Sequence, residues 1–412
     1  MTRLRSIAVA VWICLAVVFG APVTAEPPQP LLVLVSIDGF RWDYVDRVAL
    51  PTLRTLAGRG VRAEGLIPVF PSVTFPNHYT IVTGLTPDHH GVVGNTMKDP
   101  AIGLAPFTMS SATAKDTRWW GGEPIWTTAI RQGLKSAAMF WPGSEAILPT
   151  YWRPYDDALP HVNRVRQVLE WMSLPEGERP AFSTLYFSDV DKAGHDFGPD
   201  SREVIDAMVR VDAAIGDLVS GMEALGLGDR TTYVIVSDHG MAATSNDRLV
   251  FLDDYLDLDD IDVVEWSPNV TINPRPGTTA DAVYRRLADR HPALAVYTRE
   301  QMPPWLRFGA HPRIPAIVGM AEPGWTVTTH AAARDRRETA RGFTGGAHGY
   351  DPRYRDMHGL FIAAGPRLRR GLVTPALENI HVYTLMCELL GIRPAPNDGD
   401  PAEIARFTHR SR

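Results

Sequence analysis

The clearest secondary-structure pattern of the chain is in residues 200–240, which read DSREVIDAMVRVDAAIGDLVSGMEALGLGDRTTYVIVSDHG. Apolar side chains recur between positions 204 and 225 at spacings of three and four, which predicts an amphipathic helix. We expect Asp200 and Glu203 to cap its first turn and two glycines to end it. The β-branched run 232–236 follows at once and predicts a strand. A long helix that leads directly into a strand is typical of α/β proteins.

Similar short β-branched runs alternate with helical patterns along the rest of the chain. This alternation predicts a sheet of mostly parallel strands flanked by helices. The other strands of this sheet are expected at residues 31–37, 136–140, 182–187 and 360–364.

Between residues 242 and 344 the pattern changes, because prolines and short strands replace the long helices. Strands are expected there at residues 263–266, 270–273, 294–298 and 325–329. We therefore expect one α/β domain over residues 26–412, with a smaller inserted subdomain at about 242–344.

The composition is that of a globular protein, since 45% of the 412 residues are hydrophobic and 21% are charged. The 41 basic and 47 acidic residues give a formal charge of −6. A protein that binds the nucleic-acid backbone needs a basic excess, so we expect no nucleic-acid scaffold role. Only four of the basic residues are lysine. An arginine bias of this kind is expected from GC-rich codons and points to a bacterial source.

The first 25 residues have the pattern of a secretory signal. Arg3 and Arg5 precede an apolar run at 7–19, and small residues at 23–25 form a cleavage site. The apolar run is shorter than the ~20 residues that span a bilayer. We therefore expect a periplasmic or secreted protein without a stable membrane anchor. Cleavage would leave Cys387 as the only cysteine, and the oligomeric state stays open.

Acidic and histidine side chains follow three of the expected strands. They are Asp38 after the first strand, Asp191 and His195 after the strand at 182–187, and Asp238 with His239 after the strand at 232–236. A single aspartate in such a place is more often a turn former or a helix cap. Ligands of open α/β sheets bind outside the carboxyl ends of strands, however, so three such positions favour one shared site. Carboxylate and neutral imidazole suit zinc.

Two further segments carry residues of interest. Asp191 and His195 are four residues apart, so a helical turn would bring both to one ion, although a polar surface explains the pair as well. His348 lies in a glycine-rich loop at 345–349, where a ligand can approach closely.

Residues 70–79, which read FPSVTFPNHY, predict a loop that enters a helix near Thr74. From this segment alone, an ordinary capping threonine is the simpler interpretation. A hydroxyl at a helix N-terminus is also well placed to attack a phosphate, because free N–H groups and the helix dipole favour anions there.

Taken together, these segments resemble the nucleotide pyrophosphatase/phosphodiesterases of the alkaline phosphatase superfamily. The resemblance implies an alkaline-phosphatase-like fold, with a mixed, mostly parallel sheet flanked by helices and a smaller inserted subdomain. The similar blocks follow the order of the family at residues 36–41, 70–84, 90–95, 123–126, 140–144, 191–199, 236–241, 345–351 and 378–396.

The resemblance also implies two zinc ions per chain and a nucleophilic threonine, Thr74, with Asn95 stabilising the phosphoryl oxygen. Zinc would activate the hydroxyl without a separate general base. A phosphothreonine intermediate would form and then be hydrolysed, with retention at phosphorus. The implied ligands are Asp38, Thr74, Asp238 and His239 for one ion, and Asp191, His195 and His348 for the other.

The neighbours of Thr74 are Val73, Phe75, Pro76 and Asn77. A monoesterase usually places an arginine over the dianion, so this uncharged neighbourhood favours a diester. Sulfatases of the same superfamily mature a cysteine or serine to formylglycine at this position. A threonine excludes that activity.

The resemblance implies hydrolysis of nucleotide phosphodiester and pyrophosphate bonds with release of nucleoside 5′-monophosphate. The base would stack between Phe75 and Tyr155, with Tyr151 as the alternative to Tyr155, and a flat slot would select weakly among bases. The rings could instead serve only in packing. A choline-phosphodiester or phospholipid hydrolase with the same zinc site is the alternative function. An exported zinc-binding protein without turnover is disfavoured by the intact Thr74 and the full set of ligands.

Overall fold

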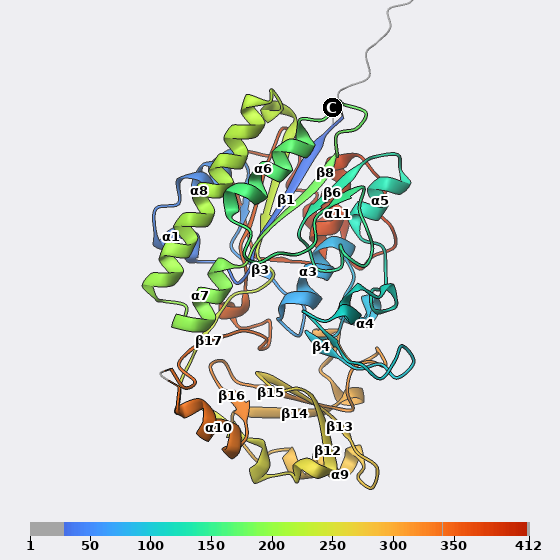
Figure 1. The fold of residues 1–412 in the computed structure, drawn as a ribbon, viewed down its shortest axis with the longest axis vertical. Helices are drawn as coiled ribbons and strands as arrows, with labels where there is room; N and C mark the ends of the chain where they lie inside the picture. Colours follow the sequence, from blue (N-terminus) through green and yellow to red (C-terminus); the bar gives the residue numbers. More distant parts are fainter. Residues whose placement is uncertain (1–28, 340, 410–412) are drawn as a thin grey trace, which may run out of the picture.

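The computed structural model describes residues 29–339 and 341–409, so the expected signal segment 1–25 lies outside the described residues. The largest element of the fold is an eight-stranded sheet (Figure 1). From one edge to the other, its strands are β19 (Leu372–Thr374), β2 (Val61–Ala63), β18 (Phe361–Ala364), β9 (Thr231–Val236), β1 (Leu31–Ile37), β8 (Phe182–Phe187), β6 (Ser136–Met139) and β7 (Tyr151–Trp152).

Parallel pairing dominates this sheet. β1 pairs in parallel with β8 and β9, and β6 pairs in parallel with β8 and β7. β18 differs, since it runs antiparallel to both β9 and β2. Every residue of β1 is buried, as expected for a strand that is covered on both faces. The expected α/β fold with a mixed, mostly parallel sheet is confirmed.

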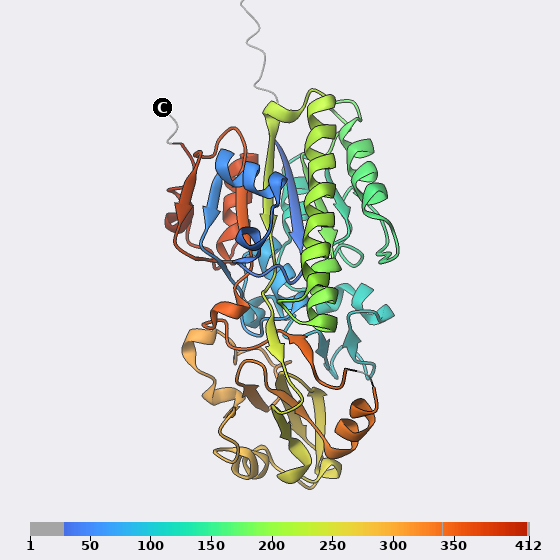
Figure 2. The ribbon, with the colours of Figure 1, turned by 90° about the vertical axis from the view of Figure 1, so that its left-hand side faces the viewer.

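Helices cover both faces of the sheet. Successive side chains of β1 point to opposite faces, so Val33 and Val35 enter one core while Leu32 and Leu34 enter the other. Figure 2 shows the longest helix, α8, lying along the first of these faces. The first face carries α2 (Pro51–Arg59), α6 (His161–Met172) and α8 (Arg202–Ala224); the second carries α3 (Thr74–Thr83), α5 (Ile125–Arg131) and α11 (His381–Leu390).

Helix α8 matches the helix expected after Asp200, but it begins differently. Its N-cap is Ser201, whose Oγ accepts a hydrogen bond from the N–H of Val204 at 3.3 Å. Asp200 instead accepts a hydrogen bond from the guanidinium of Arg47. The expected cap by Asp200 and Glu203 is therefore wrong. Serine and aspartate cap helices equally well, and the arginine partner, which is remote in sequence, draws the aspartate away.

Residues 242–344 build a second sheet with a buried cluster of its own, which includes Val270, Ile272 and Ile317. Figure 1 shows this sheet below the main one. The chain enters the segment through β10 (Ala242–Thr244) and returns through β17 (Gly345–Ala347), and these two strands pair with each other. These features support our proposal that 242–344 is an inserted subdomain. The neighbouring strands of this second sheet pair antiparallel. In their order across the sheet they are β12 (Ile261–Glu265), β13 (Asn269–Pro274), β15 (Ile317–Ala321) and β14 (Leu294–Thr298).

The other elements are short, apart from α7 (Asp189–Phe197), which lies at the carboxyl end of the main sheet. Within the described ranges, no helix combines the length and the apolar character needed to cross a membrane. The short elements are α1 (Tyr44–Arg47), α4 (Pro87–His90), α9 (Ala280–Leu287), α10 (His330–Arg337), α12 (Pro401–Ile404), and the strand pairs β3 (Leu66–Ile67) with β20 (Leu377–Glu378), β4 (Thr96–Met97) with β5 (Phe107–Thr108), and β11 (Leu249–Phe251) with β16 (Thr326–Thr328).

Candidate metal centre and active site

Three side chains of metal-ligand type meet at the carboxyl ends of β1 and β9. Asp38 directly follows β1, and Asp238 and His239 lie just beyond β9. All three are almost completely buried. The Nε2 atom of His239 lies 3.4 Å from Oδ1 of Asp38 and 3.0 Å from Oδ2 of Asp238. The parallel pairing of β1 with β9 aligns the two strand ends and so brings these donors together.

Gly39 permits this close approach. Its φ is 66°, and a Cβ atom at this position would lie 2.8 Å from the Cα of Asp191. The N–H of Gly39 donates to Oδ1 of Asp238 at 3.2 Å. A residue without a side chain is therefore needed where the end of β1 contacts both α7 and the end of β9.

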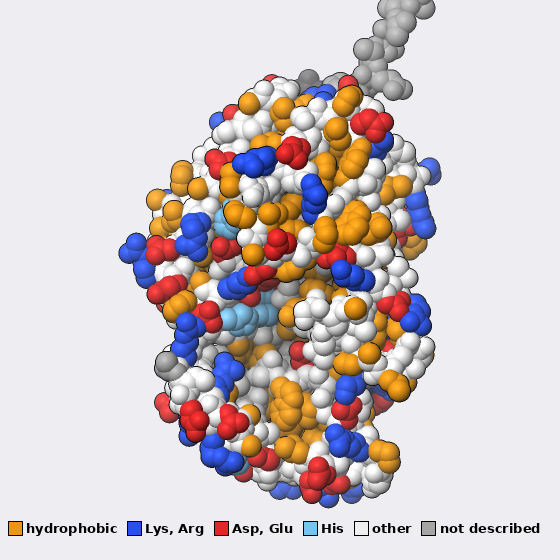
Figure 3. Space-filling model, viewed as in Figure 1, with side chains coloured by type: hydrophobic (Ala, Val, Ile, Leu, Met, Phe, Trp, Pro, Cys, Tyr) orange, Lys and Arg blue, Asp and Glu red, His pale blue; other side chains and the backbone are white. Residues whose placement is uncertain are grey.

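A second group combines residues from α7 and from the loop after β17. Asp191 and His195 lie one turn apart on α7, as the sequence predicts. The Nε2 atoms of His195 and His348 are 3.0 Å apart, and they lie 3.4 and 3.6 Å from Oδ1 of Asp191. The side chain of His195 is 42% exposed, whereas that of His348 is buried. Figure 3 shows histidine side chains gathered in the hollow between the upper and lower parts of the molecule.

All three histidines direct Nδ1 at a backbone carbonyl. A carbonyl can only accept, so Nδ1 carries the proton and Nε2 keeps its lone pair for a ligand. Metal-binding histidines are commonly oriented in this way. Burial, together with the neighbouring His239 and His195, holds the pKa of His348 well below its ordinary value, so its ring stays neutral. The acceptors are Gly240 for His239 at 2.9 Å, Gly346 for His195 at 2.9 Å and Ser72 for His348 at 3.0 Å.

The carboxylates give the second indication of a cation site. In the described part of the chain, one buried oxygen each of Asp38, Asp191 and Asp238 accepts no hydrogen bond. Burial, and then the charges of Asp238 and Asp191, raise the pKa of Asp38 well above its ordinary value. Buried negative charge is costly unless a cation neutralises it. In each of the two groups the donor atoms lie within 4.8 Å of one another, so both groups fit a metal with oxygen and nitrogen ligands.

Thr74 lies beside the first group. It is the first residue of α3, with Val73 at the N-cap. Its Oγ1 atom lies 3.4 Å from Nε2 of His239, and it lines a common cavity with Asp38 and Asp191. The hydroxyl therefore sits at the positive end of a helix and within reach of both carboxylate–histidine groups.

Asn95 lies next to Thr74 in space. Its Oδ1 atom accepts a hydrogen bond from the backbone N–H of Phe75 at 2.9 Å. Because the amide oxygen faces the helix, the Nδ2 group remains to donate toward a group bound at Thr74. The structure thus brings together the two residues that the sequence proposes for catalysis.

Two buried residues beside the first group are missing from the sequence prediction. The hydroxyl of Tyr186 donates to Oδ2 of Asp38 at 2.6 Å. The Nδ1 atom of His78 lies 3.3 Å from Oδ2 of Asp238. His78 follows Thr74 by four residues, so its helical spacing could have revealed it. Tyr186 lies within a buried strand, β8, and carries no comparable signal.

A cavity of about 450 Å³ opens beside Thr74. Phe75 and Tyr155 both line it. Tyr151 lies elsewhere, on β7, where its ring stacks on that of Trp171 with centroids 6.4 Å apart. Of the two tyrosines considered from the sequence, Tyr155 is the one that the fold brings to the cavity.

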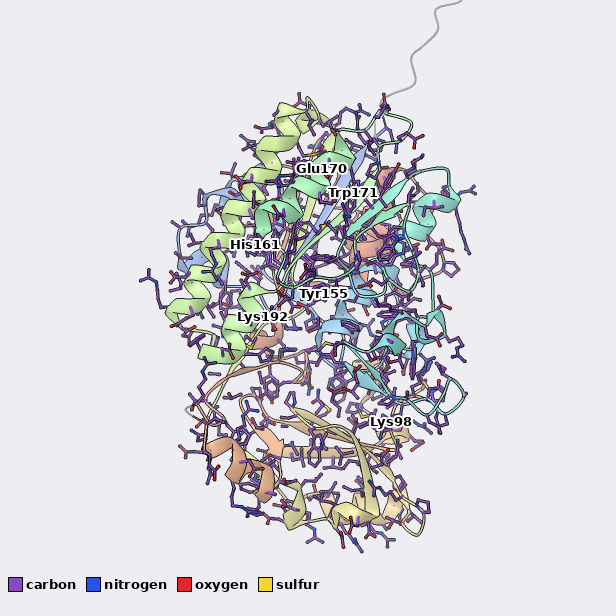
Figure 4. All side chains as sticks on the ribbon, in the orientation of Figure 1. Lys98, Tyr155, His161, Glu170, Trp171 and Lys192 are labelled. Carbon is purple, nitrogen blue, oxygen red and sulfur yellow. The ribbon has the colours of Figure 1, made fainter. Side chains whose placement is uncertain are left out.

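Tyr155 is anchored by two carboxylates. Its hydroxyl donates to Oδ1 of Asp157 at 2.8 Å, and its backbone N–H donates to Oε1 of Glu145 at 2.9 Å. Asp157 also pairs with Lys192 of α7, and Glu145 pairs with Lys115 at 2.8 Å. Figure 4 shows Tyr155 and Lys192 near the carboxyl end of the main sheet. Both lysines that line the cavity are thus neutralised by carboxylates.

These features define the class: an α/β protein with candidate metal centres at the carboxyl edge of its main sheet. The family model for type I phosphodiesterase / nucleotide pyrophosphatase matches residues 32–351, which include all the ligand-type residues described above. The chain belongs to the type I phosphodiesterase / nucleotide pyrophosphatase family.

Two curated relatives illustrate the similarity. Venom phosphodiesterase CdcPDE of Crotalus durissus collilineatus is 38% identical over 384 residues, which cover 90% of this chain and 45% of the venom protein. Human ectonucleotide pyrophosphatase/phosphodiesterase family member 1 is 38% identical over 395 residues, which cover 92% of this chain and 41% of the human protein. The chain spans less than half the length of these relatives. Both are animal proteins, so they lend no support to the expected bacterial source.

Solved structures of relatives share the fold. Murine ectonucleotide pyrophosphatase/phosphodiesterase 5, solved as an inactive variant in complex with AMP, matches with a TM-score of 0.86 and 33% identity. The match covers 92% of this chain and 100% of the murine one. The human form of the same protein gives a TM-score of 0.86 and 34% identity. The expected alkaline-phosphatase-like fold is confirmed by this likeness.

Proposed function

We propose that the chain is an exported two-zinc phosphodiesterase that hydrolyses nucleotide phosphodiester and pyrophosphate bonds and releases nucleoside 5′-monophosphate. The position of Thr74 carries this proposal. Its hydroxyl lies 3.4 Å from Nε2 of His239, within a cavity that the rings of Phe75 and Tyr155 also line. The names of the relatives and the AMP complex of the murine protein support the same substrate class.

The residues that would hold the metals follow from the two ligand groups. Bound zinc would supply Lewis-acid stabilisation of negative charge on the reacting oxygens. One ion is assigned to Asp38, Thr74, Asp238 and His239, and the other to Asp191, His195 and His348.

Thr74 carries out the first displacement. Its Oγ, having lost its proton to solvent, forms a bond to phosphorus while the leaving group departs on the opposite side. The Nδ2 group of Asn95 donates to a non-bridging phosphoryl oxygen as negative charge grows on it. The N-terminus of α3 favours the same charge. The product is a phosphothreonine that still carries the nucleoside on phosphorus. Water then hydrolyses it in a second in-line displacement, which releases the nucleoside 5′-monophosphate and restores the Thr74 hydroxyl.

The pairing of both cavity lysines with carboxylates supports a diester over a monoester as the substrate. A monoester dianion requires a free cation for charge-assisted hydrogen bonds. Lys115 and Lys192 are paired with carboxylates, whereas Arg153 donates through Nε to the neutral side chain of Gln167 at 2.7 Å and keeps its charge. The aromatic rings instead offer stacking surfaces for a base, which every nucleotide has.

A panel of three substrates tests the proposal on zinc-loaded protein. The p-nitrophenyl ester of a nucleoside 5′-monophosphate should be hydrolysed faster than p-nitrophenyl phosphate by orders of magnitude. It should also be preferred over p-nitrophenyl phosphorylcholine. A preference for the choline ester would instead indicate that the substrate is a choline or lipid diester. A preference for the monoester would contradict the diester assignment, and no hydrolysis of any substrate would contradict an enzymatic function.

The proposed export rests on the sequence pattern of residues 1–25. The mature protein, recovered from the periplasm or the medium, should begin near residue 26 when its N-terminus is determined by mass spectrometry. Recovery of the full-length chain from the cytoplasm alone would contradict export.

A further inference from the structure

The segment 242–344 reaches the loop that carries Asn95. Glu265 is the last residue of β12, and its Oε2 atom accepts a hydrogen bond from the backbone N–H of Thr96 at 3.1 Å. A residue of the second sheet is therefore hydrogen-bonded to the peptide group that directly follows Asn95.

We infer that Glu265 is a positioning residue, which holds Asn95 so that its carboxamide can donate to the reacting phosphoryl group. This inference rests on the proposed function, because it assigns Glu265 a part in the same reaction. The connection is short. The Glu265 carboxylate accepts a hydrogen bond from the N–H of Thr96, the residue after Asn95, and Oδ1 of Asn95 accepts one from the N–H of Phe75, the neighbour of Thr74.

The local backbone aims Glu265 at this loop. The pairing of β12 with β13 shifts its register between Val263 and Glu265, and such bulges re-aim a side chain. The N–H of Glu265 donates to Oγ1 of Thr271 on β13 at 3.1 Å, which fixes the bulged residue. The carboxylate lies directly against the turn before Asn95, because a Cβ added to Gly94 would lie 3.0 Å from Oε2 of Glu265.

The surroundings of Glu265 also favour a positioning role. Burial raises the pKa of Glu265 to about 7, although the nearby backbone N–H groups of Thr96 and Asn95 oppose this rise. Two cations lie in the same region, and each has another partner. Lys98 pairs with Asp262 at 2.6 Å, and Arg313 donates to Asp99 at 2.8 Å. The carboxylate thus accepts a hydrogen bond from the backbone N–H of Thr96 rather than forming a salt bridge with either cation.

Asp262 provides a matched control for Glu265. It lies three positions earlier on the same strand and binds Lys98, which follows Asn95 by three residues. Figure 4 shows Lys98 close above the second sheet. The Lys98–Asp262 pair links the same two parts of the molecule without contacting Asn95, and both side chains are about one-third exposed.

The test measures kcat and KM of the zinc-loaded mature protein on a nucleoside 5′-monophosphate p-nitrophenyl ester. Asn95→Ala should lower kcat by about 10²–10³. Glu265→Ala should lower kcat by roughly tenfold to a hundredfold and leave KM within about twofold, because the misplaced group acts in the transition state. The double variant Asn95→Ala/Glu265→Ala should be no slower than Asn95→Ala, since both changes remove one interaction. Asp262→Ala should keep kcat within about twofold.

Additive losses in the double variant, or an equal loss in Asp262→Ala, would overturn the inference. Inactive wild-type protein or an unchanged kcat in Asn95→Ala would instead contradict the proposed function.

Zinc content and thermal unfolding identify a variant that fails to fold. For that case Glu265→Gln gives a second measurement, because glutamine keeps one acceptor oxygen and cannot ionise. As the pH falls from about 8 to about 6, kcat should decline more steeply in the wild type than in Glu265→Gln; identical profiles would overturn the inference.

Discussion

The Nε2 atoms of His195 and His348 face each other at 3.0 Å, and each ring has its proton on the opposite nitrogen. Two lone pairs are thus directed at the same point, close to Oδ1 of Asp191. While both rings are neutral, neither can donate to the other, and a cation bound by both nitrogens would stabilise the arrangement.

Chelation of the metals should therefore abolish activity, and zinc should restore it. Removing one ligand leaves a defective site, so each alanine variant should lose zinc content or activity by at least about tenfold. Zinc per chain is measured by elemental mass spectrometry alongside turnover. The variants are Asp38→Ala, Asp191→Ala, His195→Ala, Asp238→Ala, His239→Ala and His348→Ala.

His89→Ala serves as the control for these variants. His89 is exposed and binds Asp398 at 2.8 Å, on a different part of the surface from the ligand groups. Its loss should leave zinc content and turnover unchanged. Full zinc loading and full turnover in His348→Ala would remove His348 from the centre.

Much of the main sheet could be predicted from sequence because its strands are buried on both faces. β1 and β8 read as short apolar runs, and their bounds match the expected 31–37 and 182–187. The position of Asp38 follows from the same logic, since it comes directly after such a run. The order of the strands could not be read in this way, because pairing depends on contacts between distant segments.

The features of the site that could not be predicted from the sequence are those that depend on tertiary contacts. Tyr186 bonds to Asp38 from a neighbouring strand, and nothing in its own segment marks it as different from a core tyrosine. The carbonyl of Ser72 sets the tautomer of His348 from a remote loop. Glu265 reaches the Asn95 loop from a bulged end of β12 in the inserted segment. Sequence patterns report local periodicity and composition, and none of these contacts is local.

Acid sensitivity should depend in part on His90, which is buried away from the ligand groups. Its Nδ1 atom accepts the N–H of Val92 at 3.0 Å, so a proton on Nδ1 would face a donor. Burial, and then the charge of His311, lower the pKa of His90 from 6.5 to about 3. Between these values the unfolded chain binds a proton that the folded chain does not, so stability falls as the pH falls below about 6.5.

The expected contribution of His90 is a loss of about 2 kcal/mol between about pH 7.5 and about pH 5. Urea unfolding at the two pH values measures it. His90→Gln should lose less stability over this interval than the wild type, whereas the exposed neighbour variant His89→Gln should lose as much. An equal loss in His90→Gln and the wild type would show that other groups cause the acid sensitivity.

The stereochemistry at phosphorus tests the phosphothreonine step. Attack by Thr74 and then by a second acceptor inverts the configuration twice, so the product should retain it. A nucleoside 5′-phosphorothioate p-nitrophenyl ester of one configuration, with methanol as the acceptor, gives a product whose configuration ³¹P NMR reports. Inversion would mean direct attack by the acceptor and would exclude Thr74 as the nucleophile.

Removal of the Phe75 or Tyr155 ring should impair the hydrolysis of nucleotide substrates more than that of other diesters. Stacking contributes roughly 1–3 kcal/mol per base by alanine substitution, and 1.36 kcal/mol corresponds to about tenfold in rate. Phe75→Ala and Tyr155→Ala should therefore lower kcat/KM for a nucleotide ester by about tenfold to a hundredfold. Methyl p-nitrophenyl phosphate has no base to stack, so its kcat/KM should change much less. Tyr155→Phe keeps the ring and loses only the hydrogen bond to Asp157, so its loss should be smaller.

Tyr151→Ala is the control for the slot, because Tyr151 stacks on Trp171 outside the cavity. It should leave the ratio of the two kcat/KM values unchanged. Equal losses on both substrates in Phe75→Ala would mean that the ring supports Thr74 structurally rather than binding a base. A loss in Tyr151→Ala together with full activity in Tyr155→Ala would contradict the assignment of Tyr155 to the base-binding slot. A loss confined to the nucleotide ester in Tyr155→Ala would show that this ring binds the base. Asp157 connects the ring to Lys192 of α7, the helix that also carries Asp191.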